Sequence, residues 1–251
     1  MNIFSDHKER IITGLALLGV VLVVGFINNF YLMWLVFGAI YLVAFKEAMA
    51  LYDVQNDKAF VYAVGLWLVA LIYPSGDDLF ILAGVIYASA IAYDRSLEWK
   101  NFLPFIYPTA GMLFMFTMYQ EYNILALMWL LVVVALTDIG AYIVGKSIGK
   151  TKFSETSPNK TLEGVVGGVL LATFGGMFMG LSIVDFSVSL AISLFVSLAS
   201  VFGDLYESSL KRKADVKDSG VIFPGHGGML DRLDGYLFGG IVMLVLLRGL
   251  V

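Results

Sequence analysis

The side chains best suited to chemistry lie between Ser208 and Asp234, near the end of the chain. This stretch combines lysines, arginines, carboxylates, one histidine and four glycines in a sequence that is otherwise mostly apolar. Carboxylates can hold a divalent cation, Lys and Arg can bind phosphate, and glycines let the backbone approach a ligand closely. Charges are costly beside a bilayer, so a polar segment of this density indicates a function. The combination is typical of phosphoryl or nucleotidyl transfer.

The composition indicates an integral membrane protein. Of the 251 residues, 59% are hydrophobic and only 14% are charged, whereas soluble domains are nearer half apolar and a quarter charged. The chain has no cysteine, which excludes disulfides and thiolate metal sites. Its two histidines, His7 and His226, are too few for a multi-histidine metal site. Any metal must therefore be held mainly by oxygen, which favours Mg²⁺ or a similar hard cation, with a second cation possible.

The apolar runs predict an all-α, polytopic helical bundle with about nine transmembrane helices. A span needs about 20 mostly apolar residues. The candidate spans are residues 11–27, 30–45, 59–74, 79–93, 103–119, 124–145, 164–182, 186–203 and 235–250. Several are short, so seven or eight spans with one or two re-entrant segments is the alternative. We expect one integral membrane domain over residues 1–251, with residues 1–130 as a helical scaffold and residues 131–251 as catalytic helices and cytoplasmic loops.

The distribution of basic residues predicts the orientation. Lys8 and Arg10 precede the first apolar run as in a signal peptide, but no small-residue cleavage site follows, so we interpret the run as a retained first helix. With nine spans and a cytoplasmic N-terminus, every Lys and Arg except Arg248 falls in an inner segment, as the positive-inside rule requires. Residues 146–163 and 204–234 then face the cytoplasm, where nucleotides are found. The predicted location is the cytoplasmic (inner) membrane, with the active site facing the cytoplasm.

A first group of candidate residues ends the eighth predicted span. Asp204, Ser208, Lys211 and Arg212 recur at helical spacing and therefore share one face. We interpret Asp204 as a metal ligand beside phosphate-binding cations. A structural cluster of ion pairs at the membrane interface is the alternative.

A second group leads into the last span. Residues 223–228, Phe-Pro-Gly-His-Gly-Gly, predict a loop whose amides can face an anion. Asp231 and Asp234 follow, three residues apart, so on a helix both could reach one cation. Aspartates in a first helical turn also favour the helix dipole, which is the structural alternative.

A third group follows the sixth span. Asp138 lies within an apolar run, where an ionisable residue indicates function by default. Lys146, Lys150 and Lys160 could bind nucleotide phosphate, with Glu163 orienting a cation or a lysine; alternatively the lysines are topology signals, and Ser157 caps the next helix. The glycines of that helix, Gly164, Gly168, Gly176 and Gly180, have the spacing of a close helix contact.

Residues 208–234 resemble the signature of the phosphatidate cytidylyltransferase (CDP-diacylglycerol synthase) family. The match runs Ser208-x-aliphatic-Lys-Arg, four residues, Lys217-Asp218, then Pro-Gly-His-Gly-Gly-aliphatic-x-Asp-Arg-aliphatic-Asp. Upstream, Asp138-x-Gly-Ala-Tyr and Ser157-Pro-x-Lys-Thr-x-Glu-Gly are similar to further family blocks, although Leu162 stands where a tryptophan is common. The strong resemblance covers about residues 135–240.

The resemblance implies that CTP and phosphatidate give CDP-diacylglycerol and pyrophosphate with Mg²⁺, for phospholipid biosynthesis. It implies cations on Asp204 and Asp231 with Asp234 nearby, phosphate contacts from Lys211, Arg212 and Arg232, and His226 beside the nucleotide or metal. The expected catalytic residues are Asp204, Asp231, Lys211, Arg212 and His226. The expected substrate-binding residues are Asp138, Lys146, Lys160, Glu163, Ser208, Lys217, Asp218 and Arg232. A homodimer is possible, and no nucleic-acid partner is expected.

Other classes of function remain open from the residues alone. A transporter would need charged or broken helices at mid-bilayer, where only Asp138 could serve. A non-catalytic membrane scaffold would not require the ordered acidic and basic groups. Within enzymes, a transferase or kinase acting on a polyprenol or an ether lipid is the nearest alternative.

Overall fold

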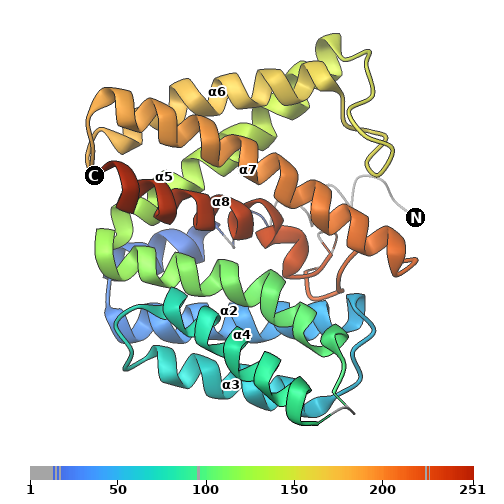
Figure 1. The fold of residues 1–251 in the computed structure, drawn as a ribbon. Helices are drawn as coiled ribbons and strands as arrows, with labels where there is room; N and C mark the ends of the chain where they lie inside the picture. Colours follow the sequence, from blue (N-terminus) through green and yellow to red (C-terminus); the bar gives the residue numbers. More distant parts are fainter. Residues whose placement is uncertain (1–13, 15, 17, 95–96, 224, 226) are drawn as a thin grey trace.

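The computed structural model describes residues 14, 16, 18–94, 97–223, 225 and 227–251, and this part of the chain is almost entirely helical (Figure 1). After a short apolar helix at Leu18–Ile27, the elements are α2 (Phe30–Leu51), α3 (Asp57–Ala70), α4 (Gly76–Tyr93), the 3₁₀ helix η1 (Trp99–Phe102), the π-helix η2 (Phe105–Thr109), α5 (Ala110–Ile148), α6 (Leu162–Gly180), α7 (Phe186–Lys213) and α8 (Leu230–Leu250). Within the described ranges the only β-type pairings are two isolated bridges, Lys152 with Thr161 and Phe223 with Gly227. The predicted all-α class is confirmed.

Among the described residues, six helical stretches are long and apolar enough to cross a membrane: 30–51, 76–93, 99–148, 162–180, 186–213 and 230–250. Helix α3 has 14 residues and Leu18–Ile27 is also short, so neither reaches the length of a span. The stretch 99–148 contains two of the predicted spans. Nine spans and a cytoplasmic N-terminus therefore stay predictions, and residues 1–13 lie outside the described part.

Helix α5 is two helical arms joined at Asn123. This residue has φ 60° and ψ −172°, a backbone conformation that residues other than glycine rarely adopt. The chain reverses direction there, so the first arm packs beside α8 and the second beside α6 (Figure 1). The reversal lies at the predicted loop 120–123.

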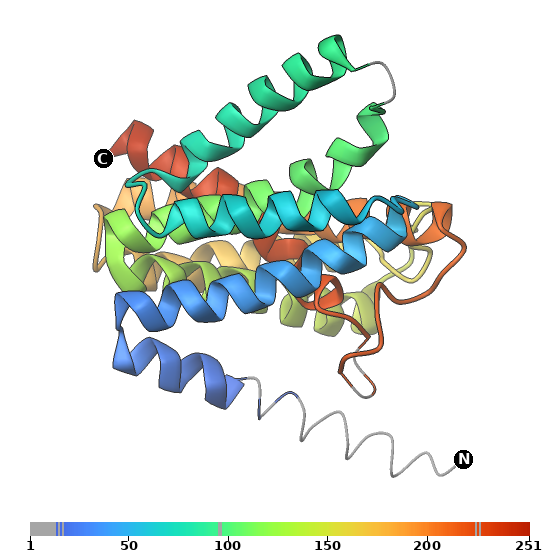
Figure 2. The same cartoon turned by 90° about the horizontal axis from the view of Figure 1, so that it is seen from below.

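Helices α5 and α6 pack through glycine, as the spacing predicted. A Cβ on Gly164 would lie 2.7 Å from the Ala141 carbonyl oxygen, and one on Gly140 would lie 2.8 Å from the Gly168 Cα. In lipid, where apolar burial offers little gain, such close backbone contact stabilises a helix pair. Figure 2 shows the contrasting case of α4, which leans away from the bundle and buries only Gly76, Asp77 and Leu79.

Hydrogen bonds between side chains hold α7 against the second arm of α5. Trp129 Nε1 donates to Ser193 Oγ at 3.0 Å, and the hydroxyls of Thr137 and Ser197 lie 2.7 Å apart. All four side chains are buried, so these bonds satisfy groups that lipid could not. Helix α7 in turn meets α8 where Gly203 lies directly against the Asp234 carbonyl.

The C-terminal end of α8 is tied to α4 and α5 by one arginine. Arg248 Nη1 lies 2.5 Å from Asp77 Oδ2, and its Nε donates to Glu121 Oε2 at 2.9 Å. The Asp77 side chain is 8% exposed, so its charge depends on this partner. Arg248 is the one basic residue that the nine-span prediction places outside the inner segments.

We expect Asp77→Asn to destabilise the protein by about 1–3 kcal/mol, the usual cost of losing a buried charged hydrogen bond. Thermal unfolding in detergent measures the effect as a lower Tm. Asp78→Asn is the matched control, because Asp78 is the exposed neighbour in the same helical turn. Equal Tm values for the two variants would contradict the structural role of the cluster.

Candidate active site

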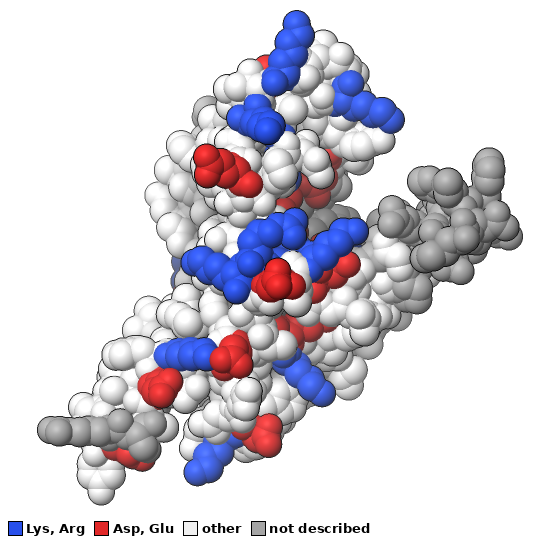
Figure 3. Space-filling model, turned by 90° about the vertical axis from the view of Figure 1, so that its right-hand side faces the viewer, with Lys and Arg blue, Asp and Glu red and all other residues white. Residues whose placement is uncertain are grey.

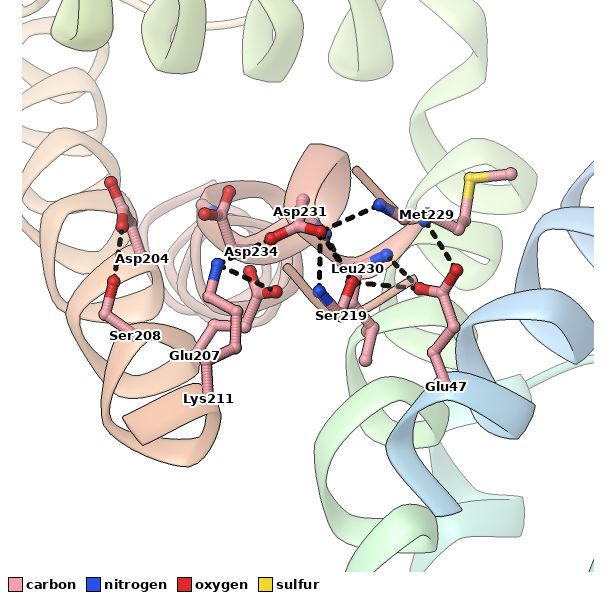
Figure 4. Close-up of polar contacts among 12 residues, drawn as sticks. Glu47, Asp204, Glu207, Ser208, Lys211, Ser219, Met229, Leu230, Asp231 and Asp234 are labelled. Carbon is pink, nitrogen blue, oxygen red and sulfur yellow. Dashed lines mark hydrogen bonds and ion pairs between the residues drawn. The ribbon is translucent and has the colours of Figure 1, made fainter. Parts of the chain in front are cut away.

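The predicted site residues of the described chain gather at one end of the bundle. This end holds the C-terminus of α7, the N-terminus of α8 and the loop between α5 and α6, and Figure 3 shows Lys and Arg concentrated there beside Asp and Glu. Asp204 and Asp231 lie on the same side of the bundle in Figure 4. The end of α7 and the start of α8 thus each place a carboxylate at this end of the bundle.

Asp204 on α7 is paired with a lysine from the α5–α6 loop. Lys160 Nζ forms a short ion pair with Asp204 Oδ2, and Ser208 Oγ donates to Asp204 Oδ1 at 3.3 Å. The loop turns back on itself, with Phe153 N donating to the Lys160 carbonyl at 2.9 Å. Both side chains of the pair are 27% exposed, so a ligand could reach them.

Asp231, in the first turn of α8, is nearly saturated with hydrogen bonds (Figure 4). Its Oδ1 accepts from Lys211 Nζ at 2.5 Å. Its Oδ2 accepts from Ser219 N at 2.8 Å, Ser219 Oγ at 2.9 Å and Gly228 N at 2.8 Å. Its position in the first turn of α8 is the one in which the helix dipole favours an aspartate, which was the structural alternative, and its role as a metal ligand stays a prediction.

The glycines before α8 are required by this packing. Gly227 has φ +79°, a conformation that side chains disfavour, and a Cβ there would lie 2.5 Å from Asp231 Oδ2. A Cβ on Gly228 would lie 2.5 Å from Glu47 Oε1 and from Ser219 Oγ. Only glycine at positions 227 and 228 allows this loop to pack against the carboxylates of Asp231 and Glu47.

Glu207 on α7 was not among the predicted site residues. Its side chain is fully buried, Lys211 Nζ lies 3.3 Å from its Oε1, and no well-aligned hydrogen bond reaches either oxygen within the described chain. Lys211 therefore sits between two carboxylates, Glu207 and Asp231. The sequence signal was its i, i+4 spacing to Lys211 at the end of an apolar helix.

Glu47 on α2 also contacts the site, although its helix belongs to the half expected to act as scaffold. Its Oε1 accepts from Met229 N at 2.9 Å, and its Oε2 accepts from Leu230 N at 2.8 Å and from Ser219 Oγ at 3.1 Å. Glu47 is 8% exposed. No spacing rule could have linked it to donors more than 170 residues away.

Asp234 lies where α7 and α8 touch. Its Oδ1 accepts from the Gly235 backbone N–H at 2.7 Å, and its own carbonyl packs on Gly203, the residue before Asp204. Figure 4 shows the Asp204 and Asp234 carboxylates on the same face of this helix pair. The close contact thus brings two predicted metal ligands together from neighbouring helices.

An open pocket of about 340 Å³ adjoins Lys160 and is lined by the third predicted group. Asp138 and Lys146 line it together with Lys160, Thr161 and Tyr142. Lys146 Nζ lies 3.3 Å from the Tyr142 hydroxyl and 5.5 Å from the centre of its ring. The lining combines these charged and polar side chains with the apolar Ala141, Val165 and Val201, a mixture that suits a ligand with a charged head and an apolar body.

Glu163 contacts backbone rather than a lysine side chain. Its carboxylate accepts from Lys150 N at 3.1 Å and from the Thr151 hydroxyl at 2.8 Å, so it fixes the start of the α5–α6 loop. The N-cap of α6 is Thr161, which accepts from Gly164 N, and not Ser157. The capping alternative thus named the wrong residue, because the loop turns again after Ser157.

The remaining predicted residues are less constrained. Four of them are exposed: Arg212, Lys217, Asp218 and Arg232. His226 lies outside the described residues. Within the described part, no three Asp, Glu or His side chains are close enough together to form a metal site on their own.

The membrane-length helices, together with the family match and the relatives described next, identify an integral membrane nucleotidyltransferase. Residues 8–250 match the Cytidylyltransferase family model, and the chain belongs to this family. It is 44% identical to a phosphatidate cytidylyltransferase of Helicobacter pylori (strain J99), over 96% of this chain and 92% of the relative. It is 32% identical to a phosphatidate cytidylyltransferase of Thermotoga maritima, over 93% of each chain. The family indicated by the 208–234 signature is confirmed.

The site predicts that Gly228→Ala is destabilising, because the added methyl group would push against Glu47 and Ser219. Overpacking of this kind costs about 1–3 kcal/mol, and thermal unfolding in detergent would show it as a lower Tm. Gly65→Ala is the control, since a Cβ there meets nothing within 4 Å. A Tm of Gly228→Ala at or above that of the control would show that the loop is not closed over Glu47.

Proposed function

We propose that this protein transfers the cytidylyl group of CTP to phosphatidate, giving CDP-diacylglycerol and pyrophosphate for phospholipid biosynthesis. The single strongest support is the 44% identity to a phosphatidate cytidylyltransferase over 96% of the chain. The joined acidic and basic side chains at one end of a membrane bundle support it independently, because both substrates are polyanions and one of them resides in the bilayer.

The reaction is an in-line displacement at phosphorus. A phosphate oxygen of phosphatidate attacks the α-phosphorus of CTP, an O–P bond forms, and the bond to the β-phosphate oxygen breaks with its electron pair leaving on pyrophosphate. Phosphatidate arrives already anionic, so no strong general base is required. The protein must bring two anions together and neutralise the charge that develops on the leaving group.

Basic side chains from both loops would bind these phosphates. Lys160 and Lys146 border the open pocket, and we assign them to the lipid phosphate. Lys211, Arg212 and Arg232 lie at the α7–α8 end and would bind the phosphates of CTP. Ser208, Lys217, Asp218 and Asp138 remain predicted contacts of the substrates, and His226 remains a predicted neighbour of the nucleotide or the metal.

Mg²⁺ fits the donor chemistry of the site, because its carboxylate oxygens are hard ligands and cysteine is absent. Asp204 and Asp234, on touching helices, would hold it. Asp231 would join them by exchanging its contact with Lys211, and a second cation would share these ligands. When bound, Mg²⁺ would neutralise phosphate charge.

We place the protein in the inner membrane with this end facing the cytoplasm, where CTP is present, and with the pocket open to the inner leaflet. The concentration of Lys and Arg at the same end supports this orientation. A homodimer stays a prediction.

Incubation of the purified protein with labelled CTP, Mg²⁺ and a panel of lipid phosphates tests the proposal. We expect a CDP-lipid from phosphatidate, loss of product with EDTA, and no product from polyprenyl phosphate. Product from polyprenyl phosphate alone would assign a different acceptor. Failure to bind CTP would favour a scaffold, and CTP-independent lipid movement in vesicles would favour a transporter.

We expect Asp204→Asn to lower kcat at least 100-fold, the typical effect of losing an electrostatic group that acts on the transition state. Its Tm should stay close to wild type, because Asp204 is partly exposed. Asp215→Asn is the matched control: Asp215 is exposed and has φ 56°, a conformation that asparagine also accepts. Wild-type turnover by Asp204→Asn at ordinary Mg²⁺ would contradict its role.

We expect Asp231→Asn to lower both kcat and Tm, because this carboxylate also accepts three hydrogen bonds from the loop before α8. Full activity of Asp231→Asn would rule out its assigned role in the reaction.

A further inference from the structure

We propose that Glu47 is a positioning residue for the transfer reaction: its carboxylate anchors the N-terminus of α8 and thereby places Asp231 and Lys211. The proposal rests on the function proposed above. It gives the first half of the chain a part in the active site beyond that of a scaffold.

The anchor replaces a missing helix cap. Met229, at the N-cap position of α8, provides no capping side chain, and the first N–H groups of a helix need acceptors. Glu47 supplies them from another helix, since its two oxygens accept from Met229 N at 2.9 Å and Leu230 N at 2.8 Å. A carboxylate at this end of a helix is also favoured by the helix dipole.

Ser219 connects this anchor to the reacting groups. Its hydroxyl lies 3.1 Å from Glu47 Oε2 and 2.9 Å from Asp231 Oδ2, and it accepts from Asp231 N at 3.3 Å. Asp231 in turn holds Lys211 through an ion pair of 2.5 Å. The four side chains thus form a continuous chain of contacts from α2 to the end of α7 (Figure 4).

The contacts of Glu47 are those of a charged carboxylate that is stabilised by hydrogen-bond donors and not by a Lys or Arg side chain. In the described chain no Lys or Arg lies within ion-pair distance of Glu47, and its charge is met by two backbone N–H groups and one hydroxyl. Two glycines make room for it, because a Cβ on Gly220 or Gly228 would meet its carboxylate oxygens. A buried charge that is held only by this segment constrains where the segment can lie.

Glu47→Gln is the sharpest variant. An amide has nearly the same shape but only one acceptor oxygen, so its NH₂ group must face Met229 N–H or Leu230 N–H. The glutamine NH₂ and this backbone N–H are then two donors facing each other, so the start of α8 is no longer held in its position. Glu98→Gln is the matched control, because Glu98 is an exposed glutamate of the same half of the chain.

The experiment has two readouts on the purified full-length protein. Hydrogen–deuterium exchange should show faster exchange of the amides at residues 228–231 in Glu47→Gln and wild-type exchange in Glu98→Gln. Turnover of CTP and phosphatidate should show kcat lower by about 10- to 100-fold, the range expected for a small displacement of reacting groups, with little change in the KM for CTP. A loss of folded protein would also lower the apparent kcat at unchanged KM, so kcat is expressed per folded molecule, with the folded fraction measured by size-exclusion chromatography.

Ser219→Ala provides an independent test, because it removes only the hydroxyl between the two carboxylates. If Glu47 acts through Ser219, the double variant should lose little more activity than the worse single variant; independent, additive losses would overturn the proposed route. Unchanged exchange at residues 228–231 in Glu47→Gln would overturn the anchor, and faster exchange with unchanged kcat would overturn its role in positioning. Absence of CDP-lipid from the wild-type protein would instead overturn the proposed function, while the exchange result still decides the anchor.

Discussion

A carboxylate beside a bilayer must have a hydrogen-bond donor or a cation, and this requirement organises the end of the molecule that holds the site. Asp204 is paired with Lys160, Asp231 accepts four contacts, and Glu47 accepts three. Two of these residues join segments that are distant in sequence: Lys160 contacts Asp204, and Glu47 contacts Met229 and Leu230. The charges that make the site reactive therefore also hold the helices and loops around it in place.

Glycine determines how closely these charges approach. Gly203 allows α7 to touch α8 beside Asp204 and Asp234, and Gly227 and Gly228 let the preceding loop close over Asp231 and Glu47. The same principle joins α5 to α6, whose contact positions the loop that carries Lys160. In a membrane, where apolar burial contributes little to helix association, such contacts are a main source of specificity.

The sequence predicted the helical class and, through residues 208–234, the family, because apolar runs and motif spacing depend on nearby residues alone. It did not predict Glu47, whose donors are backbone N–H groups at Met229 and Leu230. Every residue except proline carries a backbone N–H group, so the residue types at these positions could not indicate that they donate to Glu47. Glu207 was missed because one acid in a charged helix end looks like a surface residue until burial is known. Ser157 was the wrong cap for α6, since it is the Thr161 hydroxyl oxygen that accepts the capping hydrogen bond from Gly164 N.

Both ends of helix α8 are held by other elements. At its start, Glu47 accepts hydrogen bonds from Met229 N and Leu230 N, and at its end Arg248 forms ion pairs with Asp77 and Glu121. A helix restrained at two points cannot tilt or slide without breaking a buried ionic contact. Entry of a lipid and departure of a larger lipid product must therefore depend on motion of elements other than α8. Because contacts at both ends hold α8, we expect this helix to keep its position while substrate enters and product leaves.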